Sequence, residues 1–280
     1  MTLEDEWWDI VSKARVGQGL SEVQLAHKSD ISLAELHALK TGKPEQHVEE
    51  VGAIARALKL RPDQLRQIAL QQWRPLPTPP LMQVETIRGD IGGYEVKGYI
   101  VHNGGEAVLI DTGYNAPAML AFLERRRLKL VGICLTHGHV DHAGGIDQIL
   151  AKWPVPVYLG TGDEPLLEWS PPRNLLVTPF DGKTIRVGDL TIECLTTPGH
   201  TPGGLCYKLT HRGQPICFVG DTLFAGSIGR SNPATLYDTH LESVRRRVLT
   251  LATETVLFPG HGPATTVREE RAQNPFAGGT

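Results

Sequence analysis

The segment of this chain that most restricts its fold spans residues 136–142 and reads Thr-His-Gly-His-Val-Asp-His, directly after an apolar run. Three histidines and one carboxylate fall within six residues. Neutral imidazoles and carboxylates are the ligands that zinc, iron and manganese prefer, so the segment is typical of a metal site. At the end of a strand, side chains two residues apart point the same way. We therefore expect His137 and His139 to bind one ion while Asp141 and His142 face a second.

Three positions further along the chain offer additional ligands. His200, Asp221 and His261 each lie in a turn-forming segment that contains glycine or proline. Each segment follows an apolar, strand-like run, and such loops carry the functional residues of open α/β sheets. One such residue alone is typical of an ordinary loop. Together with the histidine-rich segment, the three predict a site for two metal ions.

Taken in chain order, these residues resemble the motif of the metallo-β-lactamase superfamily over about residues 81–276. The resemblance implies an α/β fold, an αββα sandwich with the metals at one edge. It also implies seven ligands: His137, His139 and His200 for the first metal, Asp141, His142 and His261 for the second, and Asp221 bridging both.

The choice of ligands and three further passages resemble the glyoxalase II-like branch of this superfamily. Residues 220–230, 260–263 and 269–276 are similar to the short bacterial hydroxyacylglutathione hydrolase-like proteins. The implied reaction is hydrolysis of a small thioester by a metal-bridging hydroxide, which Asp141 would orient. A thiolate leaves without a general acid, because its conjugate acid has a pKa of about 8.5.

The segment that would contact substrate departs from the longer glyoxalase II enzymes. Arg230 is a candidate ligand for a glutathione carboxylate, but the tyrosine of those enzymes is absent. Related persulfide dioxygenases hold one iron at positions matching His137, His200 and Asp221, and this alternative stays open although residues 232–233 do not reproduce their Asp-Phe pair. Lactonase and phosphodiesterase activities also stay open. Among divalent ions zinc is preferred, with iron and manganese as alternatives.

Prolines divide the chain into two parts. Four prolines within six residues exclude helix from residues 73–80 and favour an extended linker. We expect residues 1–72 to form a small all-α domain, with Ser21 and Ser32 as helix N-caps, and residues 81–280 to form the hydrolase domain. In the second part, strand-like runs alternate with helical stretches: 82–87, 96–102, 107–110, 116–127 and 239–251.

The N-terminal part resembles phage-repressor-like helix-turn-helix domains over about residues 5–70. The resemblance rests on the helical pattern of residues 19–26, the turn at 29–32 and the Gly-Lys-Pro at 42–44. It implies that the helix from about residue 32 to 41 enters the DNA major groove. The candidate DNA contacts are Ser32, Glu35, Lys40 and Lys43.

The charge of this part does not favour DNA. Residues 1–74 hold ten Lys and Arg against eleven Asp and Glu, whereas phosphate contacts require a basic surface. Three other roles therefore stand beside DNA binding: dimerisation, lining of a substrate cleft, and docking of a partner. A DNA-binding regulator with a metal-dependent sensor or hydrolase domain is the corresponding alternative for the whole chain, and a homodimer stays open.

Composition places the chain among cytoplasmic proteins. The four cysteines lie in apolar, strand-like runs, as expected of reduced core residues. A net charge of -3 argues against a general polyanion binder. No apolar run approaches the roughly 18 residues of a membrane span, so we expect no membrane association.

Overall fold

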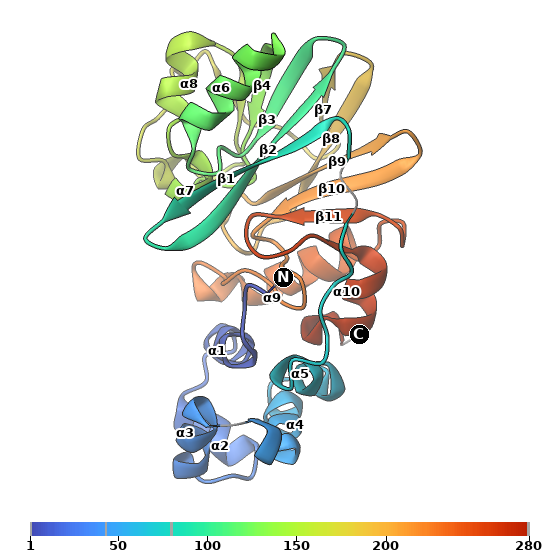
Figure 1. The fold of residues 1–280 in the computed structure, drawn as a ribbon. Coiled ribbons are helices and arrows are strands. Elements are labelled where there is room, and N and C mark those ends of the chain that lie inside the picture. Colours follow the sequence, from blue (N-terminus) through green and yellow to red (C-terminus); the bar gives the residue numbers. More distant parts are fainter. Residues whose placement is uncertain (1, 43, 79–80, 279–280) are drawn as a thin grey trace.

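The computed structural model describes residues 2–42, 44–78 and 81–278. Its first part consists of helices, which lie at the bottom of Figure 1 and are called the helical unit below. These helices are α1 (Trp7–Gly17), α2 (Glu22–Lys28), α3 (Leu33–Thr41), α4 (Val48–Ala57) and α5 (Pro62–Ala69).

Both predicted N-caps are confirmed. The hydroxyl of Ser21 accepts a hydrogen bond from the Gln24 amide at the start of α2, and that of Ser32 accepts one from the Glu35 amide at the start of α3, each at 3.1 Å. The glutamine and glutamate side chains accept the return bonds from the two serine amides. Such reciprocal caps stabilise a helix start by about 1 kcal/mol.

Between α5 and the first strand, residues 72–78 form no regular secondary structure, as the prolines require. Pro79 and Pro80 of the predicted linker lie outside the described residues.

The second part of the chain is a sandwich of two six-stranded sheets. The first sheet, in spatial order, contains β1 (Val84–Ile91), β2 (Tyr94–Asn103), β3 (Glu106–Ile110), β4 (Lys129–Cys134), β5 (Val157–Tyr158) and β6 (Leu176–Val177). The second contains β12 (Thr265–Thr266), β11 (Val256–Pro259), β10 (Gln214–Gly220), β9 (Leu205–His211), β8 (Leu190–Thr196) and β7 (Thr184–Val187).

Helices cover the outer faces of both sheets, which confirms the predicted αββα arrangement (Figure 1). The first sheet carries α6 (Ala116–Arg126), α7 (Val140–Ala143) and α8 (Ile146–Lys152). The second carries α9 (Tyr237–Ser243), which continues as one π-helical turn, and α10 (Val267–Gln273). One hydrophobic cluster fills the space between the sheets and another lies under α6 and α8.

A third cluster joins the second sheet and α9 to the helical unit. Ile10, Leu25, Leu65 and their neighbours belong to the same cluster as Tyr237 and Phe276 of the sandwich. The helical unit and the sandwich therefore share buried apolar surface, which favours a fixed contact between them.

The strand directions bring five loops to one edge of the sandwich. β3 and β4 are parallel, as are β10 and β11, and β8 runs in the direction of β10 because β9 is antiparallel to both. The carboxyl ends of these strands therefore meet, which is where α/β sheets place ligand sites.

Two composition-based expectations can be compared with the structure. All four cysteines are buried with free thiols, as predicted for core residues. None of the helices in the described part of the chain is long and apolar enough to cross a bilayer.

Candidate metal centre

The histidine-rich segment lies on a loop and one short helix. β4 ends at Cys134, His137 follows in the loop, and His139 is the N-cap of the single-turn helix α7. The strand alternation that we expected at His137 and His139 is therefore wrong. The loop bends so that both rings meet, with their centroids 4.7 Å apart.

The first group of ligand atoms comes from two loops. His200, in the loop after β8, places its Nε2 3.3 Å from Nε2 of His137 and 3.1 Å from Nδ1 of His139. These three nitrogens thus form a compact triangle of possible donors to one ion.

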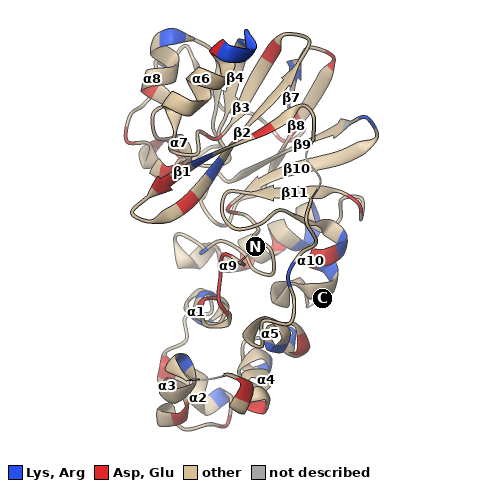
Figure 2. Cartoon of the chain, in the orientation of Figure 1, with Lys and Arg blue, Asp and Glu red and all other residues tan. Residues whose placement is uncertain are grey.

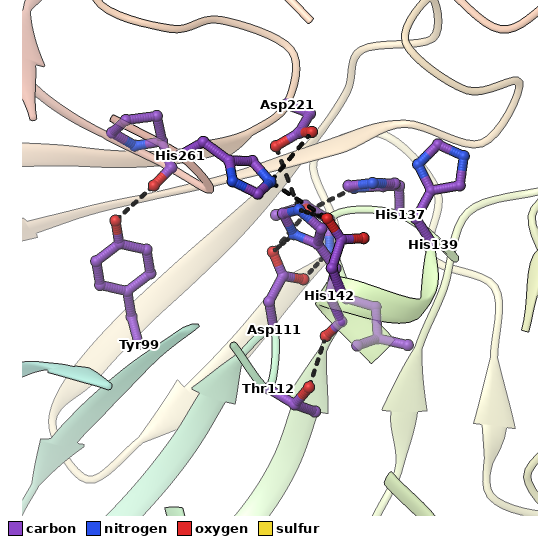
Figure 3. Close-up of polar contacts among 12 residues, drawn as sticks. Tyr99, Asp111, Thr112, His137, His139, His142, Asp221 and His261 are labelled. Atoms are coloured by element: carbon purple, nitrogen blue, oxygen red, sulfur yellow. Dashed lines mark hydrogen bonds and ion pairs between the residues drawn. The ribbon is translucent and has the colours of Figure 1, made fainter. Parts of the chain in front are cut away.

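The second group adds two residues within α7 and one residue after each of β10 and β11 (Figure 3). His142 Nε2 lies 3.2 Å from Oδ1 of Asp221, and His261 Nε2 lies 3.3 Å from Oδ2 of Asp141. The other Asp221 oxygen, Oδ2, is 3.7 Å from Nε2 of both His200 and His261. Asp221 therefore lies between the two groups, and the structure brings all seven predicted ligands together.

Hydrogen bonds to the far side of the rings determine which nitrogen faces the centre. His142 Nδ1 lies 2.8 Å from Oδ2 of Asp111, and the Thr136 hydroxyl donates to the same oxygen at 2.7 Å. His137 Nδ1 in turn lies 3.1 Å from that hydroxyl. With Nδ1 of both rings occupied by these contacts, Nε2 carries the lone pair that points inward.

Backbone carbonyls orient two more rings in the same way. His200 Nδ1 donates to the carbonyl of Arg230 and His261 Nδ1 to that of Glu95, each at 2.7 Å. Behind His261, the Tyr99 hydroxyl donates to the Pro259 carbonyl at 2.6 Å and supports the end of β11 (Figure 3).

Burial and neighbouring charges shift the pKa values of the groups in the centre in different directions. Burial lowers the pKa of His137 well below its usual range and that of His200 to about 4, so both rings are neutral at pH 7. Burial alone would raise the pKa of Asp221, but His142 and His261 hold it well below its usual range. Burial would likewise lower the pKa of His142, yet the carboxylates of Asp221 and Asp111 raise it well above its ordinary value. The centre thus offers the imidazole lone pairs of His137 and His200 beside the ionised carboxylate of Asp221, and the raised pKa of His142 reflects the same negative potential, which attracts cations.

Two buried atoms test whether these residues suit a metal. His142 Nε2 and Asp221 Oδ1 are buried and, apart from their mutual ion-pair contact at 3.2 Å, find no hydrogen-bond partner in the described part of the chain. A tetrahedral ion with bonds of about 2.0 Å separates its ligand atoms by about 3.3 Å, close to the 3.1 to 3.3 Å spacings in this cluster. The donor set therefore fits divalent metal ions.

Two carboxylates that support the centre were not found from the sequence. Asp111 accepts hydrogen bonds from both the amide and the hydroxyl of Thr136 at 2.7 Å. It follows the apolar end of β3 and precedes Thr-Gly, much as Asp221 follows β10. The same strand-then-aspartate signal could therefore have identified Asp111.

Asp163 connects the two loops of the first ligand group. Its carboxylate accepts hydrogen bonds from the Gly138 amide at 3.1 Å, the Thr201 hydroxyl at 2.7 Å and the Gly203 amide at 2.7 Å. The side chain is fully buried. Nothing in the residues around Asp163 signals this role, because the contacts join segments far apart in the chain.

Arg230, the candidate substrate ligand, lies at the rim of the centre. Its side chain is exposed while its carbonyl orients His200. α3, the helix proposed to enter DNA, lies in the part of the helical unit farther from the sandwich (Figure 1).

Three of the four candidate DNA contacts, Ser32, Glu35 and Lys40, lie in α3 or at its N-cap. Ser32 and Glu35 are exposed and cap the helix, and the Lys40 ammonium is 5.7 Å from the Trp8 ring centroid. Lys43 lies outside the described residues. Figure 2 shows acidic and basic positions interspersed over the helical unit rather than a basic surface on α3.

Proteins of similar sequence match about two thirds of this chain. The probable metallo-hydrolase YqgX of Bacillus subtilis is 30% identical over 208 residues, which cover 69% of this chain and 97% of YqgX. Hydroxyacylglutathione hydrolase GloC of Haemophilus influenzae is 31% identical over 185 residues, covering 61% of this chain and 86% of GloC. About a third of this chain therefore has no counterpart in either alignment.

Solved structures and a family model agree with these relatives. The B3 metallo-beta-lactamase BLEG-1 is 32% identical with a TM-score of 0.61, covering 70% of this chain and all of BLEG-1. The di-iron-bound form of TTHA1623 is 32% identical with a TM-score of 0.58, covering 68% of this chain and 99% of TTHA1623. The model of the metallo-beta-lactamase superfamily matches residues 91–261, more than half of the sequence. This chain, with its two-sheet sandwich and its cluster of histidines and aspartates, belongs to the metallo-beta-lactamase superfamily.

Proposed function

We propose that this protein is a dinuclear metal-dependent hydrolase that cleaves a small thioester of the hydroxyacylglutathione type. One observation carries the proposal: the ligand atoms of five histidines and two aspartates converge, while hydrogen bonds occupy Nδ1 of four of the rings. Hydrolase relatives of similar sequence support the reaction class.

The proposed ligands divide by their contacts. His137, His139 and His200 would hold one ion, Asp141, His142 and His261 the other, and Asp221 both. When bound, two divalent ions supply a water of lowered pKa and polarise the carbonyl of the substrate.

Asp141 is the carboxylate best placed to act on that water. Its side chain is 22% exposed, compared with 10% for Asp221, so it reaches the open side of the centre. Its Oδ2, 3.3 Å from Nε2 of His261, would accept a hydrogen bond from the attacking water and orient it toward the acyl carbon. Water adds to the carbonyl and the carbon–sulfur bond breaks, giving a carboxylic acid and a thiol.

A thioester suits a site whose proposed machinery contains no dedicated acid. A thiolate leaves more readily than an amine because its conjugate acid has a pKa of about 8.5. A hydroxyacylglutathione would also supply carboxylates for the exposed guanidinium of Arg230, which could bind one of them with two hydrogen bonds. Among the similar proteins, GloC is named for this substrate class.

The proposal is tested by metal content and turnover on the same preparation. We expect two divalent ions per chain and hydrolysis of S-lactoylglutathione, with a β-lactam and glutathione persulfide as comparison substrates. Two ions without thioester hydrolysis would refute the substrate assignment. One iron per chain with oxygen uptake on the persulfide would instead identify a mononuclear dioxygenase.

A further inference from the structure

One loop connects a proposed metal ligand to the candidate substrate residue. Residues 222–230, called the bridging loop below, begin directly after Asp221 and end with Arg230. The Gly229 amide donates to the Asp221 carbonyl at 3.0 Å, and the Arg230 carbonyl accepts from His200. The position of the bridging loop therefore affects both groups of ligand atoms.

The outer side of this loop rests on the helical unit. Lys13 of α1 forms an ion pair with Asp5 and donates to the Ile228 carbonyl at 2.8 Å. Asp5 also accepts a hydrogen bond from the hydroxyl of Ser227, a fully buried residue. The paired side chains of Asp5 and Lys13 thus bind two consecutive residues of the bridging loop, Ser227 and Ile228.

Lys13 also contacts the ring of Phe224, which packs against His261 in a second loop of the metal centre. The Lys13 ammonium is 4.8 Å from the Phe224 ring centroid, and that ring meets His261 edge to face with centroids 5.8 Å apart. Next to His261, Gly262 has a φ of +66°, and a Cβ there would lie 2.9 Å from that of Glu4. The N-terminal segment therefore packs directly against the loops that carry Asp221 and His261.

Close packing extends along this junction. A Cβ at Gly17, the last residue of α1, would lie 2.3 Å from the ring of Tyr237. A Cβ at Gly226 in the bridging loop would lie 2.8 Å from Trp73 and 3.1 Å from Ile68. The contact between the helical unit and the sandwich therefore leaves no room for a side chain at either glycine.

Burial makes the ion pair sensitive to loss of either partner. The side chains of Lys13 and Asp5 are only 9% and 10% exposed. Removing one partner leaves a poorly hydrated, uncompensated charge at the junction, and this penalty exceeds the net gain of the intact pair. The pair therefore favours one docked arrangement over others.

We propose that Lys13 and Asp5 are positioning residues of the metal centre: by docking the helical unit on the bridging loop, they set the geometry of Asp221 and His261. The helical unit would then be part of the active-site structure. This inference goes beyond the proposed function and does not depend on which ester is hydrolysed.

The test compares Lys13→Met and Asp5→Asn with Lys13→Arg, which keeps the charge, and with Lys28→Met, an exposed lysine at the end of α2. Hydrogen exchange is measured on the metal-free full-length protein. Lys13→Met and Asp5→Asn should speed exchange of the Ser227 and Gly229 amides by about tenfold or more, while amides of β3 and β4 keep their rates. Lys13→Arg should restore most of the protection, and Lys28→Met should leave it unchanged.

A second readout is metal affinity by chelator competition. Changes to groups that orient ligands lower affinity by about 10–100-fold, so we expect about a tenfold loss for the weaker ion in Lys13→Met. If Lys13→Met does not fold, Asp5→Asn gives the same comparison with a nearly isosteric side chain. Unchanged loop exchange and unchanged affinity in a folded variant would overturn the proposal, as would a uniform rise in exchange over the whole sandwich. Neither readout uses a substrate, so a wrong thioester assignment would not affect them.

Discussion

Nδ1 of His142 lies 2.8 Å from Oδ2 of Asp111, and this contact determines that Nε2 of His142 faces the other ligands. Because the Thr136 hydroxyl donates to the same carboxylate oxygen, Asp111 also orients His137 through that hydroxyl. One buried carboxylate outside the seven proposed ligands thus fixes two of them.

Replacing Asp111 should therefore weaken metal binding without removing a ligand. In Asp111→Asn, we expect affinity to fall by about 10–100-fold, because the amide cannot favour the same His142 tautomer. Chelator competition measures the change, with Asp147→Asn on the exposed side of α8 as the control. Equal affinities in Asp111→Asn and the unsubstituted protein would show that this contact does not orient the ring.

Asp163 should be required for both stability and the first group of ligands. Asp163→Ala leaves two buried amides and one buried hydroxyl without their acceptor, and each such group costs about 1–3 kcal/mol. We expect urea unfolding to show a loss of roughly 3 kcal/mol or more, with weaker metal binding at His139 and His200. A variant that keeps its full stability would mean that water replaces the carboxylate.

Much of the centre could be predicted from the sequence because its signals are local. A strand-like run followed by His, Asp, Gly or Pro identified His200, Asp221 and His261, and the structure places His200 beside His137, and Asp221 and His261 beside His142. The αββα sandwich was predicted because these residues match the motif of the metallo-β-lactamase superfamily. The N-caps Ser21 and Ser32 were predictable because a cap depends on residues three positions apart.

The rest depends on contacts between distant segments, which no local pattern encodes. Asp163 bonds to residues 25 and 40 positions away. The apolar residues of α1 and α5 read as the core of a small helical bundle, yet their cluster continues into the second sheet. The expected strand alternation at His137 failed because the chain leaves β4 before the motif begins.

The buried acid Glu270 should make stability depend on pH. Burial raises its pKa from 4.5 to about 7, despite hydrogen bonds from Asn274, Thr265 and Gly226. Because the folded protein then holds this proton more tightly than the unfolded chain, the contribution to stability is full below pH 4.5 and is lost as pH rises through about 7. The expected loss is about 3 kcal/mol.

Glu270→Gln removes this titration. Between pH 4.5 and 8, the free energy of unfolding of the unsubstituted protein should therefore fall by about 3 kcal/mol relative to that of Glu270→Gln. Urea unfolding across the range measures it, and Glu242→Gln on the exposed side of α9 should keep the original slope. Parallel pH profiles for all three proteins would contradict the raised pKa.

Arg230 should affect substrate binding more than turnover. Its exposed guanidinium lies at the rim of the centre, and a hydrogen bond to a charged group contributes about 1.5–3 kcal/mol. We therefore expect Arg230→Met to raise KM for S-lactoylglutathione by about 10–100-fold with kcat nearly unchanged. Arg268→Met, an exposed arginine of α10, is the control. An unchanged KM would remove Arg230 from the proposed substrate site.

The most direct test of the central claim is the number of metal ions bound per chain, before and after loss of one ligand of the second group. His261→Ala removes the ring whose Nε2 faces Asp141 and Asp221 but leaves His137, His139 and His200 intact. The proposed arrangement predicts two ions per chain in the unsubstituted protein, one in His261→Ala, and loss of most hydrolytic activity with the second ion. A single ion in both proteins, bound with the same affinity, would contradict it.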